Sequence, residues 1–341
     1  MGNRTGGGRY TFFVSPTSER IRWKPLAAMP AEAEKWARPG YAQVVQQWRE
    51  ARQALTRPGT DRLALDIFLR ERRREFAIET GQIEGLYTLR QGITEQLITE
   101  GLEGVRSSHT LEGVDDPTIK GLLADQEAAL ELVFATVRQE RPLSHSVICE
   151  WHALLTRHQE TVVGITLQGQ RVEVPFEEKG VYKIRPNNPR RPDGVIHEYC
   201  PPEQCRAEMD RLFSFCEDIQ KKNYPAEVEA AWLHHRFVAT HPFRDGNGRV
   251  ARQLMAYAYI RNGLPPPVIR AADRGAYIAS LELADGGNLR PFCDRLALAA
   301  ETTLLNAVQT AERALAGNHR IHHPNGGITN KGRYYPPEPR H

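Results

Sequence analysis

The sequence predicts a mostly α-helical protein with one small β-hairpin. Apolar residues recur at three- and four-residue intervals through most of the chain, which is the pattern of helices with one buried face. Of the 341 residues, 40% are hydrophobic, enough for one large core. The composition departs from the helical pattern at about 160–202, where valine, isoleucine, tyrosine, glycine and proline are frequent.

The chain divides into three parts by composition. Residues 1–59 carry a glycine run and turn formers before their first helical pattern, so they are predicted to form an irregular arm and a helix. Residues 60–317 hold the main helical pattern and form the central part, which contains all the candidate site residues described below. Residues 318–341, "NHRIHHPNGGITNKGRYYPPEPRH" from position 318, lack an apolar period and predict a flexible tail.

Within the central part, helices are predicted in order along the chain. The stretches "DRLALDIFLRERRREFAIETG", "IKGLLADQEAALELVFATVRQE" and "SHSVICEWHALLTRHQ" each place apolar residues on one helical face. The stretch at about 160–202 follows, with short extended runs at Val181–Ile184 and Val195–Tyr199 on either side of the turn-forming "RPNNPRRPDG". These two runs are therefore expected to pair as a hairpin. Helices then resume and continue to about residue 317.

Charge and cysteine content exclude several classes of protein. The net charge is only +3, too small to indicate a nucleic-acid partner by itself. The five cysteines are scattered without a CxxC pair, which favours a reducing compartment over a disulfide scaffold. No apolar run of about 18 residues and no signal-peptide core is present, so a cytoplasmic protein without a membrane partner is expected.

The segment "THPFRDGNGRVARQ", Thr240–Gln253, interrupts two predicted helices with ionisable groups. A helix over Ala226–Thr240 delivers a histidine at its end, and a second helix begins near residue 248. Between them, Gly246, Asn247 and Gly248 tolerate positive φ, so their backbone N–H groups can converge on an anion at the N-terminus of the second helix. Phosphate is the obvious candidate.

The side chains around this turn have complementary chemistry. Arg249 and Arg252 lie three residues apart on the second helix, where guanidinium groups can bind further phosphate oxygens. Asp245 is a hard oxygen ligand suited to a Mg²⁺ ion that bridges phosphates. His241 has an ordinary pKa near neutrality and can take a proton from an incoming hydroxyl.

Three other interpretations of the segment were weighed. "GNGRVA" satisfies the loose dinucleotide-binding spacing, but a helix precedes it instead of a strand. The phosphate-binding P-loop requires a GK[ST] ending that is absent. A metal-hydrolase site formed by His234, His241 and Asp245 would leave the arginines and glycines without a role.

"HPFRDGNGRVAR" resembles the signature of the Fic family, H-P-F-x-[DE]-G-N-G-R-x-x-R, at every fixed position. The resemblance implies a Fic-type helical bundle that transfers AMP from ATP to a hydroxyl of a target protein. It implies that His241 is the general base, that Asp245 binds Mg²⁺, and that Phe243 anchors the loop. The remaining motif positions would bind the nucleotide: Gly246, Asn247, Gly248, Arg249 and Arg252.

The resemblance leaves the reaction partly open. Doc-type relatives, which phosphorylate their target, depart from the glycine pattern that is intact here, so nucleotidyl transfer is favoured. Phosphocholine transfer, removal of AMP from a target, and an interaction module of a toxin–antitoxin or signalling complex stay as alternatives. A homodimer is compatible with the family, although no sequence feature decides it.

Residues at about 180–200 resemble the hairpin, or flap, that family members place beside the active site. An exposed strand edge can bind a target segment through backbone hydrogen bonds. The resemblance therefore implies a target-binding role for Val181, Tyr182, Lys183 and Ile184. The preceding "TVVGITLQGQRVEVPFEEK" has no counterpart in this expectation.

The segment "TGQIEG" resembles the family's inhibitory motif, [ST]-x-x-x-E-[GN], with Thr80, Glu84 and Gly85 at its fixed positions. Its place before the motif matches the class in which an inhibitory helix, here expected at about 76–90, precedes the catalytic core. The implied mechanism is competition, in which Glu84 pairs with Arg252 and keeps this arginine from the γ-phosphate.

A third segment, "GAYIASLELADGGNLRPF", resembles the part of the family that closes over the base. Tyr277 would then stack on adenine. Asp285 stands where relatives often have asparagine, and a carboxylate accepts hydrogen bonds but does not donate them.

Overall fold

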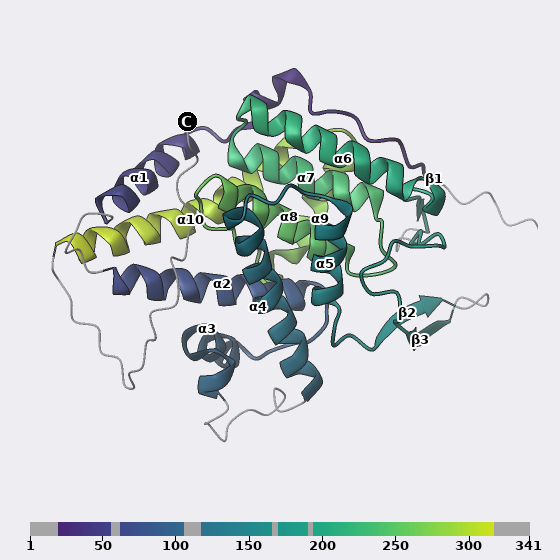
Figure 1. The fold of residues 1–341 in the computed structure, drawn as a ribbon, viewed down its shortest axis with the longest axis horizontal. Helices are drawn as coiled ribbons and strands as arrows, with labels where there is room; N and C mark the ends of the chain where they lie inside the picture. The colour runs from purple at the N-terminus through teal and green to yellow at the C-terminus, as the bar shows by residue number, and fades with distance from the viewer. Residues whose placement is uncertain (1–19, 56–61, 106–116, 166–169, 190–193, 317–341) are drawn as a thin grey trace, which may run out of the picture.

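The computed structural model describes residues 20–55, 62–105, 117–165, 170–189 and 194–316, and it is mostly helical, as predicted (Figure 1). The flexible tail expected at 318–341 lies outside the described residues, as does the start of the N-terminal arm. The helices are α1 (Tyr41–Ala54), α2 (Leu63–Ile83), α3 (Gln91–Val105), α4 (Pro117–Arg138), α5 (His145–Leu155), α6 (Pro202–Lys222), α7 (Ala226–Thr240), α8 (Asn247–Arg261), α9 (Arg274–Asp285) and α10 (Arg290–Leu315), with 3₁₀ turns η1 (Ala31–Trp36) and η2 (Ala271–Asp273). The strands are β1 (Arg20–Ile21), β2 (Thr161–Ile165), β3 (Arg171–Pro175) and β4 (Ile196–His197).

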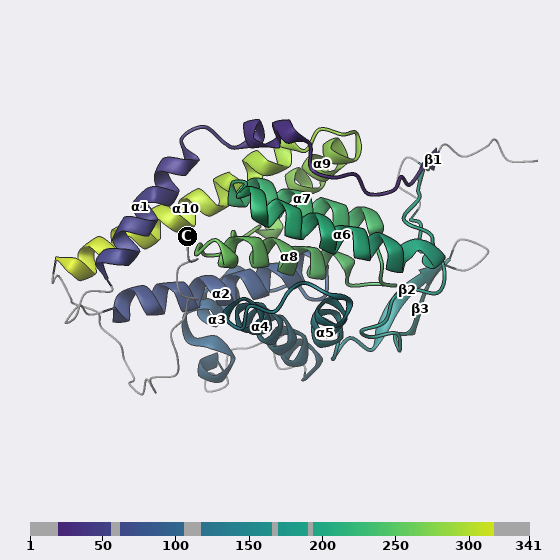
Figure 2. The same ribbon diagram turned by 45° about the horizontal axis from the view of Figure 1, so that its top comes forward.

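Helix α8 is the centre of the bundle. It packs against α7 along most of its length and also contacts α4, α5 and α2 (Figures 1 and 2). Of its 15 residues, 13 are buried, which is the pattern of a helix covered on all sides. Because α7 and α8 are consecutive and packed together, the loop between them is held against the core.

The N-terminal arm lies along the outside of the bundle. Its backbone crosses α6, where the Leu26 N–H donates to Oε2 of Glu208 at 2.7 Å, and its Leu26 and Met29 side chains are buried. Strand β1 of the arm pairs in parallel with β4, 176 residues away in sequence. The arm therefore fixes the segment that precedes α6.

The predicted hairpin between Val181–Ile184 and Val195–Tyr199 is wrong in its pairing. Among the described residues of this stretch, 181–184 form no strand, and β4 pairs with β1 instead. The reason is that the backbone N–H of Lys183, which a strand partner would need, donates instead to the Pro242 carbonyl of the motif loop at 2.8 Å. Among the described residues, the antiparallel hairpin is β2–β3, which lies within the stretch 161–179 that had no counterpart in the expected flap.

The inhibitory helix expected at about 76–90 is also shifted. Helix α2 is longer, begins at Leu63 and ends at Ile83, so that Glu84 is its C-cap residue. Gly85 has φ 70°, and the Leu86 N–H donates to the Gly81 carbonyl at 3.1 Å, a hydrogen bond typical of a Schellman helix end. Glu84 is thus held at a helix terminus.

The five cysteines are free thiols. None of the helices within the described ranges combines the length and apolar content that a membrane span requires.

The end of α2 allows a stability prediction with a matched control. A Cβ on Gly81 would lie 2.1 Å from the hydroxyl oxygen of Tyr87, a buried ring that donates to the Ile78 carbonyl. Overpacking of this kind costs about 1–3 kcal/mol, against roughly 1 kcal/mol that alanine gains over glycine in a helix. We expect Gly81→Ala to lower the free energy of unfolding by about 1–2 kcal/mol in urea titrations.

Gly92→Ala on α3 is the control, because nothing lies within 4 Å of its Cβ position. This variant should be neutral or more stable by up to about 1 kcal/mol. Equal stability of the two variants would contradict the close packing of Tyr87 on α2.

Candidate active site

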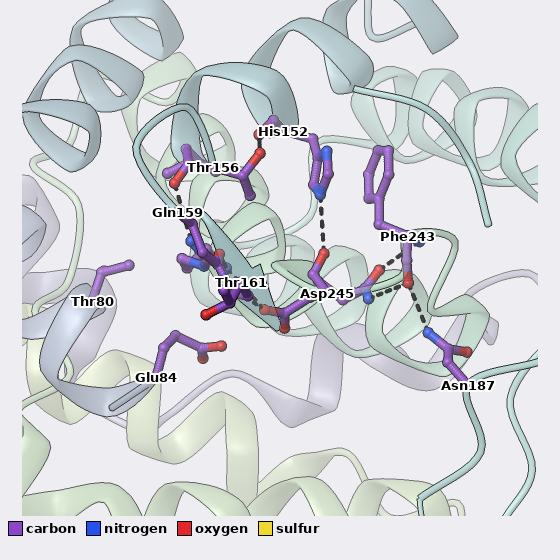
Figure 3. A network of polar contacts seen from close by, with 12 residues as sticks. Thr80, Glu84, His152, Thr156, Gln159, Thr161, Asn187, Phe243 and Asp245 are labelled. Atoms are coloured by element: carbon purple, nitrogen blue, oxygen red, sulfur yellow. Dashed lines mark hydrogen bonds and ion pairs between the residues drawn. The ribbon is translucent and has the colours of Figure 1, made fainter. Parts of the chain in front are cut away.

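The loop between α7 and α8 is closed by Asn247. Its side-chain Oδ1 accepts from the Phe243 N–H at 2.9 Å and its Nδ2 donates to the Phe243 carbonyl at 2.7 Å. The Phe243 carbonyl also accepts from Nδ2 of Asn187 at 2.7 Å (Figure 3). Phe243 itself is fully buried, as expected for a loop anchor. The anion-binding role predicted for Asn247 concerns its backbone N–H group, and its side chain has a separate function, because it shapes the loop.

His241 ends α7 in the left-handed region, with φ 50°. Its Nδ1 lies 3.1 Å from the Val238 carbonyl, which can only accept, so Nδ1 carries the proton and Nε2 carries the lone pair. Burial lowers the pKa of His241 to about 3, with a further contribution from Lys183. At neutral pH the imidazole is therefore uncharged and can accept a proton at Nε2.

Asp245 lies on the loop with its side chain 41% exposed. Burial acts to raise its pKa, but Arg249, at 3.5 Å, and Gln159, which donates to Oδ2 at 2.7 Å, together hold the pKa of Asp245 below its ordinary value. The carboxylate thus stays ionised. A single ionised carboxylate at a cavity fits Mg²⁺, which commonly takes one or two carboxylates and completes its shell with water and phosphate oxygens.

The two motif arginines are buried and point to different partners. Arg249 is 1% exposed and donates to the Leu155 carbonyl at 3.0 Å and to Oε1 of Gln159 at 2.6 Å. Its guanidinium therefore holds the end of α5 against the loop. The predicted phosphate role of Arg249 would require these hydrogen bonds to change.

Arg252 faces the end of α2. Its Nη2 lies 2.7 Å from Oε1 of Glu84 and 3.3 Å from the Thr80 carbonyl, while Nη1 lies 3.4 Å from the Tyr277 hydroxyl. The structure thus brings together Thr80, Glu84 and Arg252, as the sequence predicted. Thr80 contributes its backbone carbonyl.

Tyr277 is placed differently from the expectation that it stacks on a base. Its ring is 2% exposed, and its hydroxyl accepts from Arg252 and forms a hydrogen bond with Nε2 of His234 at 2.8 Å. In this arrangement Tyr277 holds Arg252 and presents no open face. Asp285 accepts from Nε2 of the buried His235 at 3.0 Å.

Glu84 also lies against the first turn of α8. A Cβ on Gly248 would be 2.6 Å from Oε1 of Glu84, so only glycine permits this approach. Figure 3 shows the Glu84 side chain directed from the end of α2 toward the loop that carries Asp245. A carboxylate therefore lies against the first turn of α8, near the end of the helix where the helix dipole favours an anion.

A cavity of about 1120 Å³ opens beside the loop. Its walls are the Glu84 turn, the β2–β3 hairpin and the segment 183–189, and Arg244 and Asp245 also line it. This is large enough for a nucleotide-sized ligand.

Of the four residues predicted for the target-binding flap, two face solvent and two face inward. Val181 is 51% exposed and Ile184 is 78% exposed. The Tyr182 hydroxyl lies 2.8 Å from Nδ1 of His145, and Lys183 is 5% exposed with its ammonium donating to Asn187. Only the outward pair is available to a partner.

Sequence reasoning missed two residues of α5 and its C-terminal turn that support the loop. His152 accepts from the Gly180 N–H at Nδ1 (2.8 Å), donates from Nε2 to the Asp245 carbonyl (3.0 Å), and stacks on Phe243 at 3.8 Å. Gln159 bridges Asp245 and Arg249. Neither has a sequence signal, because both reach the motif across more than 80 positions.

The metal-hydrolase alternative has no support in the geometry. His234 is fully buried and its Nε2 is hydrogen-bonded to the Tyr277 hydroxyl. Within the described residues, no group of three or more His, Cys, Asp or Glu side chains is placed to hold a metal ion.

The buried His152 gives a pH prediction. Burial lowers its pKa to about 4, and protonation of Nδ1 would also break the bond from Gly180. The unfolded chain takes up this proton near pH 6.5 and the folded chain does not, so stability is lost as the pH falls from about 6.5 toward 4, by about 1.4 kcal/mol per pH unit. His152→Gln can replace both hydrogen bonds without titrating.

We expect urea titrations between about pH 4.5 and 6.5 to show a smaller fall in unfolding free energy for His152→Gln than for the parent. Other titrating groups are common to both proteins and cancel in the difference. Parallel curves would mean that His152 titrates alike in the folded and unfolded chain.

Comparisons with known proteins agree with this geometry. The Fic/DOC family model matches residues 142–259, a range that contains α5, α6, α7 and most of α8. Protein adenylyltransferase fic-1 of Caenorhabditis elegans is 34% identical over 103 residues, which is 30% of this chain and 20% of that protein. Protein adenylyltransferase Fic of Nematostella vectensis is 45% identical over 115 residues, 32% of this chain and 26% of that protein.

Solved structures share the fold over a longer range. A Fic domain containing signaling protein from Bacteroides thetaiotaomicron has a TM-score of 0.63 at 24% identity, covering 80% of this chain and 96% of that chain. Fic-1 from C. elegans has a TM-score of 0.59 at 23% identity, covering 79% and 70%. The match to these curated relatives spans only about a fifth to a quarter of their length. The range matched by the family model includes the whole loop from His241 to Arg252. Residues 142–259 of this chain therefore belong to the Fic/DOC family.

Proposed function

We propose that this chain is a protein adenylyltransferase that transfers AMP from ATP to a Ser, Thr or Tyr hydroxyl of a target protein and of itself. The observation that carries the proposal is an uncharged His241 beside the N-terminus of α8, with an Nε2 lone pair that has no hydrogen-bond partner among the described residues. A proton acceptor and an anion site side by side suit the attack of a hydroxyl on a phosphate. The names of the relatives favour AMP as the transferred group.

The proposed reaction uses His241 as general base. The target hydroxyl oxygen forms a bond to the α-phosphorus of ATP, the bond from this phosphorus to the β-bridging oxygen breaks, and pyrophosphate leaves. His241 Nε2 takes the hydroxyl proton. Arg252 and the first amides of α8 would bind the phosphate oxygens and compensate their charge.

Asp245 would hold Mg²⁺ in this reaction. The ion would supply charge neutralisation on the phosphates. Gln159 and Arg249 keep the Asp245 carboxylate oriented and ionised, so the ligand is prepared before the nucleotide arrives.

We further propose that Glu84 inhibits the reaction in cis. Its carboxylate contacts Arg252 at 2.7 Å and lies against Gly248, the position where a phosphate would meet α8. One side chain thus pairs with Arg252 and also lies close to the first turn of α8. A γ-phosphate that reached Arg252 would have to displace Glu84, which costs a charge-assisted bond of about 1.5–3 kcal/mol.

Labelled ATP tests both proposals through self-modification. The Glu84→Gly variant should incorporate label from the α-phosphate about 10- to 100-fold faster than the parent, the factor that corresponds to this bond. His241→Ala in the same background should abolish incorporation, because the base is lost.

A matched pair of variants isolates the contact with Arg252. Glu84→Gln and Glu160→Gln each remove one carboxylate from the same cavity, but only Glu84 pairs with Arg252. Activation should follow Glu84→Gln alone. Transfer of label from the γ-phosphate would identify a kinase. If no label is transferred from the α-phosphate or from the γ-phosphate, nucleotidyl transfer is refuted. Equal rates for the parent and Glu84→Gly would refute inhibition by Glu84.

A further inference from the structure

A second aromatic side chain covers His241. The ring of Tyr199 lies 3.8 Å from the imidazole centroid at an interplanar angle of 7°, which is a nearly parallel stack. The ring of His197 stacks on Tyr199 at 4.7 Å, and the Lys183 ammonium lies 5.9 Å from the Tyr199 centroid. Tyr199 was expected only as the end of a hairpin strand.

The backbone around Tyr199 is fixed from several directions. The Tyr199 N–H donates to Oδ1 of Asn188 at 2.9 Å, and the preceding Glu198 N–H donates to the Ile21 carbonyl of the N-terminal arm at 2.9 Å. Cys200, the next residue, is 1% exposed. The ring is therefore presented to His241 by a segment whose backbone is hydrogen-bonded at two successive residues and whose next residue is buried.

The imidazole needs this support. Apart from the stack, the anchor of its ring is the bond from Nδ1 to the Val238 carbonyl. One hydrogen bond restrains the position of Nδ1 but allows the ring plane to tilt, and a tilt moves Nε2 away from the line on which a hydroxyl approaches. A parallel ring at van der Waals distance fixes that plane.

We propose that Tyr199 is the positioning residue of the general base: its ring holds the plane of the His241 imidazole and keeps water off that face. Tyr199 acts through His241 and contacts neither ATP nor the target. The inference rests on the proposed role of His241.

The charged and titratable groups around His241 are Lys183, His197 and Asp245. Lys183 and His197 lower the pKa of the imidazole, Asp245 raises it, and burial has the largest effect. Removal of the Tyr199 ring leaves all three groups in place and reduces the burial. The imidazole pKa should then rise toward its ordinary value near 6.5.

The kinetic test compares Tyr199→Phe with Tyr199→Leu in the Glu84→Gly background. Phenylalanine keeps the stacked ring, so its rate of AMP transfer should stay within about twofold of the background. Leucine removes the ring and should lower kcat by about 10- to 100-fold, the effect of a displaced reacting group. The KM for ATP should not change, because Arg252 and Asp245 are untouched.

His197→Leu is the matched control. It removes the ring on the opposite face of Tyr199 from the same segment and leaves the Tyr199–His241 stack. Its kcat should stay within about threefold of the background. If it falls as far as Tyr199→Leu, the segment as a whole is responsible and the specific role of Tyr199 is wrong.

A second measurement does not depend on activity. Imidazole ¹⁵N spectra recorded against pH should report a neutral His241 with its proton on Nδ1 in the parent and in Tyr199→Phe down to about pH 5. In Tyr199→Leu the pKa should rise and the two tautomers should mix. Unchanged spectra and unchanged kcat would overturn the inference. Absence of AMP transfer in every variant would refute the proposed function, while the spectra still decide whether Tyr199 positions His241.

Tyr199 is half-buried, and the thermal unfolding midpoint checks that the leucine variant folds. If it does not, Tyr199→Met carries the same expectation, because its unbranched side chain fills irregular space without a ring. Normal kcat and normal spectra in that variant would equally overturn the inference.

Discussion

Two guanidinium groups buried on one helix determine the arrangement of the site. Arg249 and Arg252 are each 1% exposed on α8, and a buried charge is tolerated only when it is paired or hydrogen-bonded. The end of α5 supplies acceptors for Arg249, and the end of α2 supplies acceptors for Arg252. The hydrogen bonds that the buried arginines require therefore hold the ends of α2 and α5 next to α8.

This constraint explains which parts of the site were predictable. The loop from His241 to Arg252 is local, so the helix ends on either side of it followed from the residues themselves, and the proposals of an anion site and a base could be made from the same residues. The contact of Glu84 with Arg252 spans 168 positions and was anticipated only through a family motif. His152 and Gln159 gave no signal, because a histidine and a glutamine in a helical pattern have many ordinary roles.

The errors share one physical cause. The segment Val181–Ile184 has strand-like composition, but the donor that a strand partner would need, the Lys183 N–H, is taken by the Pro242 carbonyl. Tyr277 has the ring of a base-stacking residue, but its hydroxyl is needed between Arg252 and His234. In both cases the motif loop and its arginine require hydrogen bonds that composition does not reveal.

The hydrogen bonds of Arg252 also indicate how this side chain would be held if Glu84 were removed. Without that carboxylate, the guanidinium would still donate to the Thr80 carbonyl and the Tyr277 hydroxyl, so it would keep its place and would have a free donor. These two uncharged oxygen acceptors orient the guanidinium but do not compensate its charge. Arg252 is thus built to remain in position while its anionic partner changes, which is the property that competition between a carboxylate and a phosphate requires.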